Sequence, residues 1–273
     1  MPGAFTLSFF PAIVLALLAA SPVAAAQNGA SGCALEGQPG ERVVAVVEGF
    51  ELLLEDGRRV QPAGIDPPAA TRDDPQFGAH GRQALAARLV GTMIEGPPAG
   101  APPDRWGRVI GPIFAEAPVG AAPGDVAAMI VATGAARVRP DAAAGACMPS
   151  LLRAEALARQ ARLGLWADPA YAVLSADAPD TFVGRFGTLQ IVEGRVTSIG
   201  ESGPFSYLNF GPRRGVDFTV VIARQNSKAF ERAGLPLHGV LGRRVRVRGF
   251  LDKASGPQIE ISAPDWLEMI EGK

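Results

Sequence analysis

The chain has 273 residues, of which 48% are hydrophobic, which is enough for one large domain or two small ones around a real core. Only 19% of the residues are charged and the formal net charge is -1, so the overall charge gives no reason to expect a nucleic-acid or membrane-surface binder. The 33 glycines and 24 prolines predict many turns and argue against a helical bundle, and two cysteines are too few for a zinc cluster or an iron–sulfur site.

The N-terminus has the pattern of an export signal. Residues 4–26 are apolar and uncharged, and the small residues at 24–26 fit cleavage by signal peptidase. An uncleaved membrane anchor is the alternative, but Pro11 and Pro22 leave too short an apolar run to span a bilayer. We therefore expect a signal peptide at residues 1–26, a periplasmic or secreted protein, and no stable membrane insertion after cleavage.

Export to an oxidising compartment favours a disulfide between Cys33 and Cys147, because disulfides form and persist there. These two residues are the only possible intramolecular pair of cysteines. In the chain-entropy model a bridge across so long a loop stabilises the fold by about 4–5 kcal/mol. Two buried thiols or an intermolecular link are the alternatives, and the predicted export favours the bridge.

Strand patterns begin at residue 41. Alternating apolar residues predict strands at 43–47, 51–54 and 58–65, and Asp56-Gly57 is a strong turn signal between the last two. A further strand is expected at 109–115.

Three helices are expected among and after these strands. The first covers residues 81–90, where Leu85 and Leu89 share one face. Asp125 is a suitable cap for a second helix through residue 132, and the third begins at Pro149 and runs to about residue 162.

The second half of the chain predicts a separate β-rich module. Residues 169–185 contain Pro and Asp with few large apolar residues, which is typical of a linker. In the domain expected at residues 186–273, five strands with one helix after the third match the order of an OB-fold barrel. The strands are expected at 189–199, 205–210, 217–223, 243–250 and 258–261, and the helix at 227–233.

Four stretches of the first module carry a resemblance to a known family. In chain order they are Val46-Val47-Glu48-Gly49, Ala63-Gly64-Ile65-Asp66-Pro67-Pro68, Asp104-Arg105-Trp106-Gly107-Arg108, and Leu151-Leu152-Arg153-Ala154-Glu155 followed by Gly164-Leu165-Trp166. Residues 41–168 thereby resemble the staphylococcal-nuclease (thermonuclease) family. The resemblance implies a mainly β fold of the α+β class, with an OB barrel of five strands packed by three helices.

The family's chemistry defines what a working site requires. Cleavage of a phosphodiester needs a nucleophilic water, a base and positive charge around the phosphoryl oxygens. The resemblance implies that carboxylates hold Ca²⁺, that a Glu orients or deprotonates the water, and that two arginines stabilise the developing charge.

Most of these positions are substituted in this chain. The first metal-carboxylate position holds Phe50, the first arginine position holds Gln61, and the position of the catalytic Glu holds Ala69. Asp66 matches the second metal carboxylate and Arg108 the second arginine. Because loss of one donor to a developing charge costs about a hundred- to a thousandfold in rate, we expect a degraded nuclease site that uses Ca²⁺ only if it is active.

Neighbouring charges offer a rearranged site as the alternative. Glu48 stands two residues from Phe50, on the same face of a predicted strand, and could supply a metal ligand. Arg59 stands in the same relation to Gln61 and could reach a phosphate. The ordinary interpretation of such residues is a water-exposed charge.

Asp66 and Arg108 also have structural interpretations. The Asp66 carboxylate could bond its own backbone in a turn, and Arg108 could form a salt bridge with Asp104. For Arg108 a structural role and a ligand-binding role are equally expected. His80 and His238 are distant in the sequence and predict neither a metal site nor a catalytic triad.

The second module offers candidate ligand-binding residues. Arg244, Arg246 and Arg248 alternate with apolar residues, which places the arginines on one face of a strand. Tyr207 and its aromatic neighbours could provide a base-stacking surface. We favour a solvated outer face over a groove for single-stranded nucleic acid or another anionic ligand.

Two functions from different classes follow. The favoured one is an exported binding or scaffold protein in which the nuclease-like module is retained for its shape. The alternative is a calcium-dependent phosphodiesterase that hydrolyses DNA or RNA with a rearranged site. The ligand of the second module and the oligomeric state are not defined by the sequence.

Overall fold

The computed structural model describes residues 32–33, 40–116 and 123–270. The expected signal peptide at residues 1–26 lies outside these described ranges. Within them, no helix is both long and apolar enough to cross a membrane.

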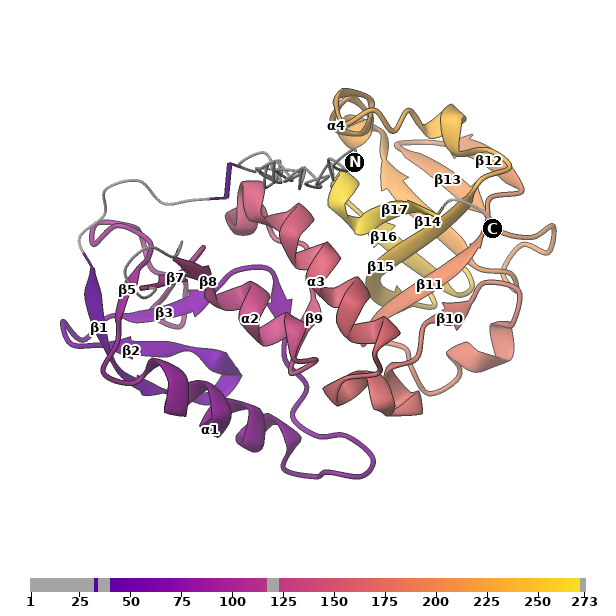
Figure 1. Cartoon of the computed structure of the whole chain (residues 1–273). Helices are drawn as coiled ribbons and strands as arrows, with labels where there is room; N and C mark the ends of the chain where they lie inside the picture. Colours follow the sequence, from indigo (N-terminus) through magenta and orange to yellow (C-terminus); the bar gives the residue numbers. More distant parts are fainter. Residues whose placement is uncertain (1–31, 34–39, 117–122, 271–273) are drawn as a thin grey trace, which may run out of the picture. The chain divides into compact units, whose positions relative to one another are not determined.

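The first sheet combines the predicted strands of the first half with two that were not predicted, β5 and β8 (Figure 1). Its order is β6-β3-β2-β1-β5-β7-β8, and all neighbouring pairs are antiparallel except β3 and β6, which run parallel. A separate two-stranded pair joins β4 to β9. The bounds are β1 (Glu41–Val46), β2 (Leu52–Leu54), β3 (Arg59–Pro62), β4 (Ile65–Asp66), β5 (Met93–Glu95), β6 (Arg108–Gly111), β7 (Phe114–Ala115), β8 (Gly124–Asp125) and β9 (Arg137–Val138).

The strand expected at 109–115 is divided in two. Strand β6 ends at Gly111 and β7 begins at Phe114, so that Pro112 stands in the break. Proline has no N–H to donate to a sheet ladder, which explains why a single continuous strand does not form there.

Three helices pack with this sheet, as expected: α1 (Phe77–Leu89), α2 (Val126–Ala132) and α3 (Met148–Gln160). Helix α1 starts four residues before the predicted position, and Leu85 and Leu89 are buried on its inner face. Helix α2 begins after Asp125, whose carboxylate accepts hydrogen bonds from the N–H groups of Ala127 and Ala128 at 2.9 and 3.3 Å. Helices α2 and α3 lie side by side (Figure 1).

The Gly-Leu-Trp segment after α3 requires a glycine because its backbone lies close to that of Gly134. Gly164 has φ 52° and Gly134 has φ 71°, and the N–H of Leu165 donates to the carbonyl of Gly134 at 3.0 Å. A Cβ atom on Gly164 would lie 2.4 Å from the Gly134 carbonyl oxygen. Only glycine fits either position without moving the backbone.

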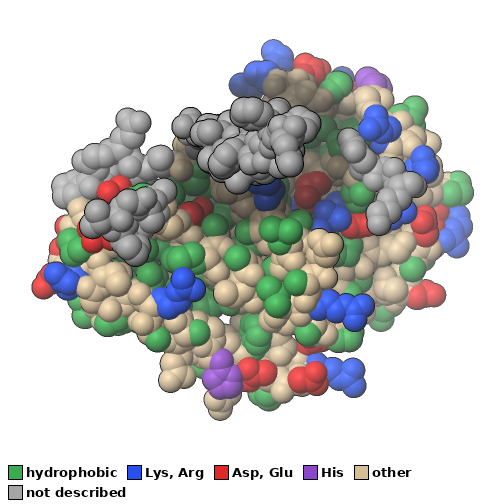
Figure 2. All heavy atoms as spheres, viewed as in Figure 1, with side chains coloured by type: hydrophobic (Ala, Val, Ile, Leu, Met, Phe, Trp, Pro, Cys, Tyr) green, Lys and Arg blue, Asp and Glu red, His purple; other side chains and the backbone are tan. Residues whose placement is uncertain are grey.

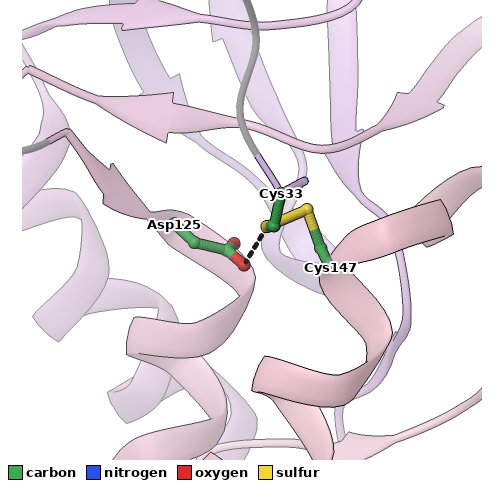
Figure 3. A group of neighbouring side chains, drawn as sticks. All are labelled: Cys33, Asp125 and Cys147. Carbon is green, nitrogen blue, oxygen red and sulfur yellow. Dashed lines mark hydrogen bonds between the residues drawn. A yellow bond between two sulfur atoms is a disulfide. The ribbon is translucent and has the colours of Figure 1, made fainter. Parts of the chain in front are cut away.

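The predicted disulfide is present between Cys33 and Cys147 (Figure 3). It links the chain before β1 to the residue that precedes α3. The Asp125 carboxylate points toward it, with Oδ2 3.8 Å from the Cys33 sulfur, and burial raises the pKa of this carboxyl.

The second sheet has strands at all five places expected in the second half, but the strand expected at 189–199 is divided into β11 and β12, and β10 and β17 were not expected. Its order is β10-β11-β15-β16-β14-β13-β12, with β17 added to β15. Strands β11 and β12, at the two sides of this order, are separated in sequence only by Val196 and Thr197, and β14 runs parallel to β16. The bounds are β10 (Leu174–Ser175), β11 (Leu189–Arg195), β12 (Ser198–Ser202), β13 (Phe205–Asn209), β14 (Thr219–Ala223), α4 (Ser227–Arg232), β15 (Arg244–Asp252), β16 (Gln258–Ile261) and β17 (Leu267–Ile270).

The segment 169–185 carries short structure of its own. It contains β10, which pairs with β11, and two 3-10 turns, η4 (Pro169–Tyr171) and η5 (Pro179–Phe182). Just before it, Trp166 belongs to a small buried cluster with Ile191 of β11. The domain boundaries themselves stay a prediction.

Candidate functional site

Two of the substituted positions of the family site line one pocket. Phe50 and Ala69 both face a hollow of about 330 Å³, together with Glu48 and three prolines. Neither Asp66 nor Arg108 belongs to its lining. The two retained residues are therefore separated from the place where the substituted positions meet.

Phe50 is held by an unusual backbone. It ends the short 3-10 turn η1 (Glu48–Phe50), has φ 63°, and is 2% exposed. Its ring packs on α1, where a Cβ on Gly81 would lie 3.0 Å from Cζ. The expectation that Glu48 and Phe50 share one face of a strand is wrong, because the turn exposes Glu48 and buries Phe50.

Gln61, at the first arginine position, is buried in β3. Its Oε1 atom has no hydrogen-bond partner among the described residues. A neutral amide in this place supplies no positive charge to a phosphoryl group.

Asp66 is paired with a basic side chain of the fold. Its Oδ2 accepts a hydrogen bond from Arg137 at 2.7 Å, across the β4–β9 pair. Arg137 is buried and also donates to the carbonyl oxygen of Leu189 at 2.6 Å. An arginine so placed competes with any cation for this carboxylate.

Arg108 is held by two carboxylates. Its Nε and Nη2 donate to Asp104 Oδ2 at 2.9 and 2.8 Å, and its backbone N–H donates to Asp104 Oδ1 at 2.9 Å. The salt bridge with Asp104 that the sequence suggested is thus present. Its remaining Nη1 donates to Glu51 Oε1 at 3.1 Å.

Glu51 was not recognised from the sequence. Its side chain is buried, and its second oxygen accepts a hydrogen bond from Arg59, which lies beside Arg108 in the β3–β6 register. Nothing in the sequence distinguishes Glu51 from other charged residues at strand edges, and only the turn at Gly49 and Phe50 directs it inward. Glu51 and the two arginines form the charged group to which we refer as the Glu51 cluster.

Asp104 and Arg108 favour each other's charged form. Hydrogen bonds from the Arg108 guanidinium lower the pKa of Asp104 to about 2. Hydrogen bonding to Asp104 likewise raises the pKa of Arg108 above its ordinary value. These groups are therefore ionised at neutral pH and neutralise one another.

An exposed aromatic ring lies next to the Glu51 cluster. Trp106 is 56% exposed, and the guanidinium carbons of Arg105 and Arg108 lie 3.9 and 4.8 Å from its ring centroid. Arg105 makes no ion pair within the described part of the chain. Stacked guanidinium groups beside an indole form a surface suited to nucleic-acid bases and phosphates.

The residues do not fit the calcium ion that a nuclease of this type needs. Phe50 offers no ligand and Asp66 is paired with Arg137. A metal ion needs several His, Cys, Asp or Glu side chains close together. Among the described residues, one group of three or more meets this condition: Cys33, Asp125 and Cys147. Its cysteines form the disulfide, so this group is structural.

A protein family model matches part of the first half of the chain. Residues 59–168 match the model of the family described as staphylococcal nuclease homologue. The chain contains a domain of this family. No curated protein matches the chain.

Beyond the nuclease homologue domain, the arginines of β15 are not a free face. Arg248 is 1% exposed and bonds to Glu155 at 2.8 Å and to Glu268 at 2.6 Å. Arg246 bonds to Glu193 at 2.6 Å, and the exposed Arg244 lies 3.6 Å from the same carboxylate. The prediction of three solvated arginines is wrong for Arg248, because its guanidinium is buried against Glu155 of α3.

Tyr207 lies on the outer side of β13 and is partly exposed. Its ring contacts that of Phe205 edge to face, with centroids 6.5 Å apart, whereas Phe210 is buried in the core. Figure 2 shows charged side chains of both signs interspersed over the face in view, without a large area of one sign among the residues described. Tyr207 stays a candidate ligand-binding residue.

Proposed function

We propose that this is an exported binding protein whose nuclease homologue domain holds single-stranded nucleic acid without cleaving it. The observation that carries the proposal is the pairing of both retained family residues with the protein's own side chains. Asp66 is bonded to Arg137, and Arg108 is bonded to Asp104 and Glu51.

Hydrolysis requires charges that are free to change partners. A metal carboxylate must be available to the cation, and an arginine must be available to the phosphoryl oxygens as their charge increases. Here Asp66 is paired with Arg137, a phosphate must displace Glu51 to reach Arg108, and the base position is Ala69. The combined losses exceed the hundred- to thousandfold that a single missing donor costs.

The surface around Trp106 supports binding of a single strand. An exposed indole stacked with Arg105 presents aromatic surface and a positive charge together, which is the combination that sequence-tolerant single-strand binders use. A duplex hides its base faces, so this surface favours unpaired bases.

Calcium-dependent phosphodiester hydrolysis is the second candidate. Membership of residues 59–168 in the nuclease homologue family favours it. Export from the cell applies to both candidates and follows from the apolar N-terminal pattern.

The binding proposal is tested by fluorescence anisotropy with a labelled oligothymidylate in the presence of chelator. We expect saturable binding that weakens as salt is raised, because arginine–phosphate contacts release counterions. Trp106→Ala should weaken binding by about tenfold or more, since stacking on an aromatic contributes about 1–3 kcal/mol per base. Leu157→Ala, an equally exposed apolar residue on α3, is the matched control and should bind as the parent does. Equal binding by both variants, or none by the parent, would contradict the proposal.

A further inference from the structure

The Glu51 carboxylate bridges two arginines from neighbouring strands. Oε2 accepts from Arg59 and Oε1 accepts from Arg108 at 3.1 Å. The two arginines are register partners of the parallel β3–β6 pair, so their side chains emerge side by side. Each oxygen of one anion is thus satisfied by a separate guanidinium.

Each of these arginines is anchored by other contacts. Asp104 accepts three hydrogen bonds from Arg108, which fix the guanidinium and leave Nη1 directed at Glu51. The Nη1 of Arg59 donates to the carbonyl of Trp106 at 3.3 Å, which leaves Nη2 directed at Glu51. Both donors therefore keep their places when the Glu51 carboxylate is exchanged for another anion, and such preorganisation favours binding.

The cluster can be reached from solvent on the side of Arg59. The Arg59 side chain is 44% exposed, whereas that of Glu51 is 7% exposed. An anion that approaches from outside meets the guanidinium before it meets the carboxylate. Paired guanidinium groups bind phosphate oxygens with short, charge-assisted hydrogen bonds.

We propose that Glu51 is a built-in competitor for phosphate: its carboxylate occupies Arg59 and Arg108 in the absence of ligand, and a phosphate takes its place between the two guanidinium groups. The inference rests on the proposed function, because the phosphate belongs to the strand whose bases stack at Trp106. Arg59 takes the role of second cation that Gln61 does not fill. Glu51 sets the affinity, since a phosphodiester must displace it.

Glu51→Gln tests this directly, because the amide keeps the side-chain shape and removes the competing charge. Binding of inorganic phosphate is measured by isothermal titration calorimetry at low ionic strength, and binding of oligothymidylate by anisotropy. Charged hydrogen bonds contribute about 1.5–3 kcal/mol, so release of the arginines should tighten phosphate binding about tenfold or more. The matched control is Glu55→Gln, an exposed residue outside the cluster, which should leave the affinity unchanged.

The tighter phosphate binding expected of Glu51→Gln must depend on both arginines. In the double variant Glu51→Gln/Arg59→Ala the tightening should disappear. Arg59→Ala in the parent should itself weaken oligothymidylate binding, which keeps the proposal testable if Glu51→Gln does not fold. Unchanged or weaker phosphate affinity in a folded Glu51→Gln variant, or no effect of Arg59→Ala, would overturn the proposal.

The two proposals fail in different ways. If oligothymidylate binds at Trp106 but Glu51→Gln changes neither ligand's affinity, the competitor proposal is wrong and the proposed function stands. If Glu51→Gln binds inorganic phosphate tightly but no variant binds oligothymidylate, the anion site is supported and the nucleic-acid function is wrong.

Discussion

Arg248 of β15 and Glu155 of α3 form a buried ion pair across the two halves of the chain, with Nη2 and Oε2 2.8 Å apart. The exposed fractions of the two residues are 1% and 0%. Both also bond to Val138: Glu155 accepts from its N–H at 2.7 Å, and Arg248 donates to its carbonyl at 3.1 Å. Val138 of β9 is thereby bonded through both its N–H and its carbonyl group.

Removal of Arg248 should be strongly destabilising. Arg248→Met leaves the Glu155 charge buried with only Arg159 at 3.4 Å as a basic partner, and breaking a buried pair costs about 3–5 kcal/mol. The free energy of unfolding is measured by urea denaturation. Arg244→Met, which removes an exposed arginine from the same strand, should cost less than about 1 kcal/mol. Similar losses of unfolding free energy in the two variants would show that the buried pair stabilises the fold no more than the exposed one.

The nuclease homologue domain should depend on the second half for stability. A chain that ends at residue 168 loses Arg248 as the partner of Glu155 and the Leu189 carbonyl that accepts from Arg137. We expect this fragment to unfold at a much lower urea concentration than the full chain, or to lack a cooperative transition. A fragment as stable as the full chain would instead establish two independent domains.

The disulfide should make a large contribution to the free energy of unfolding. Cys33→Ser/Cys147→Ser removes a bridge between residues 114 apart in sequence. The chain-entropy model predicts a loss of about 4–5 kcal/mol in the free energy of unfolding. Urea denaturation of the parent with a reductant should reproduce the loss, and the double variant should not respond to the reductant. A reductant effect that persists in the variant would contradict this assignment.

Because of Asp104, the free energy of unfolding should fall as the solution is made acidic. Its folded pKa of about 2 lies below its unfolded value of about 3.9, so the unfolded state takes up the proton first as the pH falls. The stabilisation from the pair with Arg108 is therefore complete above the unfolded value and is lost as the pH falls through about 2. The stability difference between the parent and Asp104→Asn should shrink over this window. A constant difference down to pH 2 would assign the effect to shape and not to charge.

Local patterns in the sequence were sufficient for most elements. The Asp125 cap, the inner face of α1 and the disulfide all depend on spacing or on the count of cysteines, and all three are present. Period-two spacing correctly placed Arg244, Arg246 and Arg248 on one strand face. It carries no information about what packs against that face, which is why the burial of Arg248 was missed.

The candidate site was predictable only in part. Motif positions identified Phe50, Gln61 and Ala69 as substitutions. They could not reveal that Glu51 turns inward, because this depends on the positive φ values of Gly49 and Phe50. The partner of Asp66 was equally hidden, since Arg137 is 71 residues away in sequence.

Hydrolysis of single-stranded DNA and RNA by the purified protein, with calcium and with chelator, tests the central claim most directly. Arg108→Ala serves as the control for contaminating nuclease. The account predicts no cleavage by the parent above the background of this variant, because the Asp66 and Arg108 charges are already paired within the protein. Calcium-dependent cleavage that disappears in Arg108→Ala would contradict it and establish a rearranged active site.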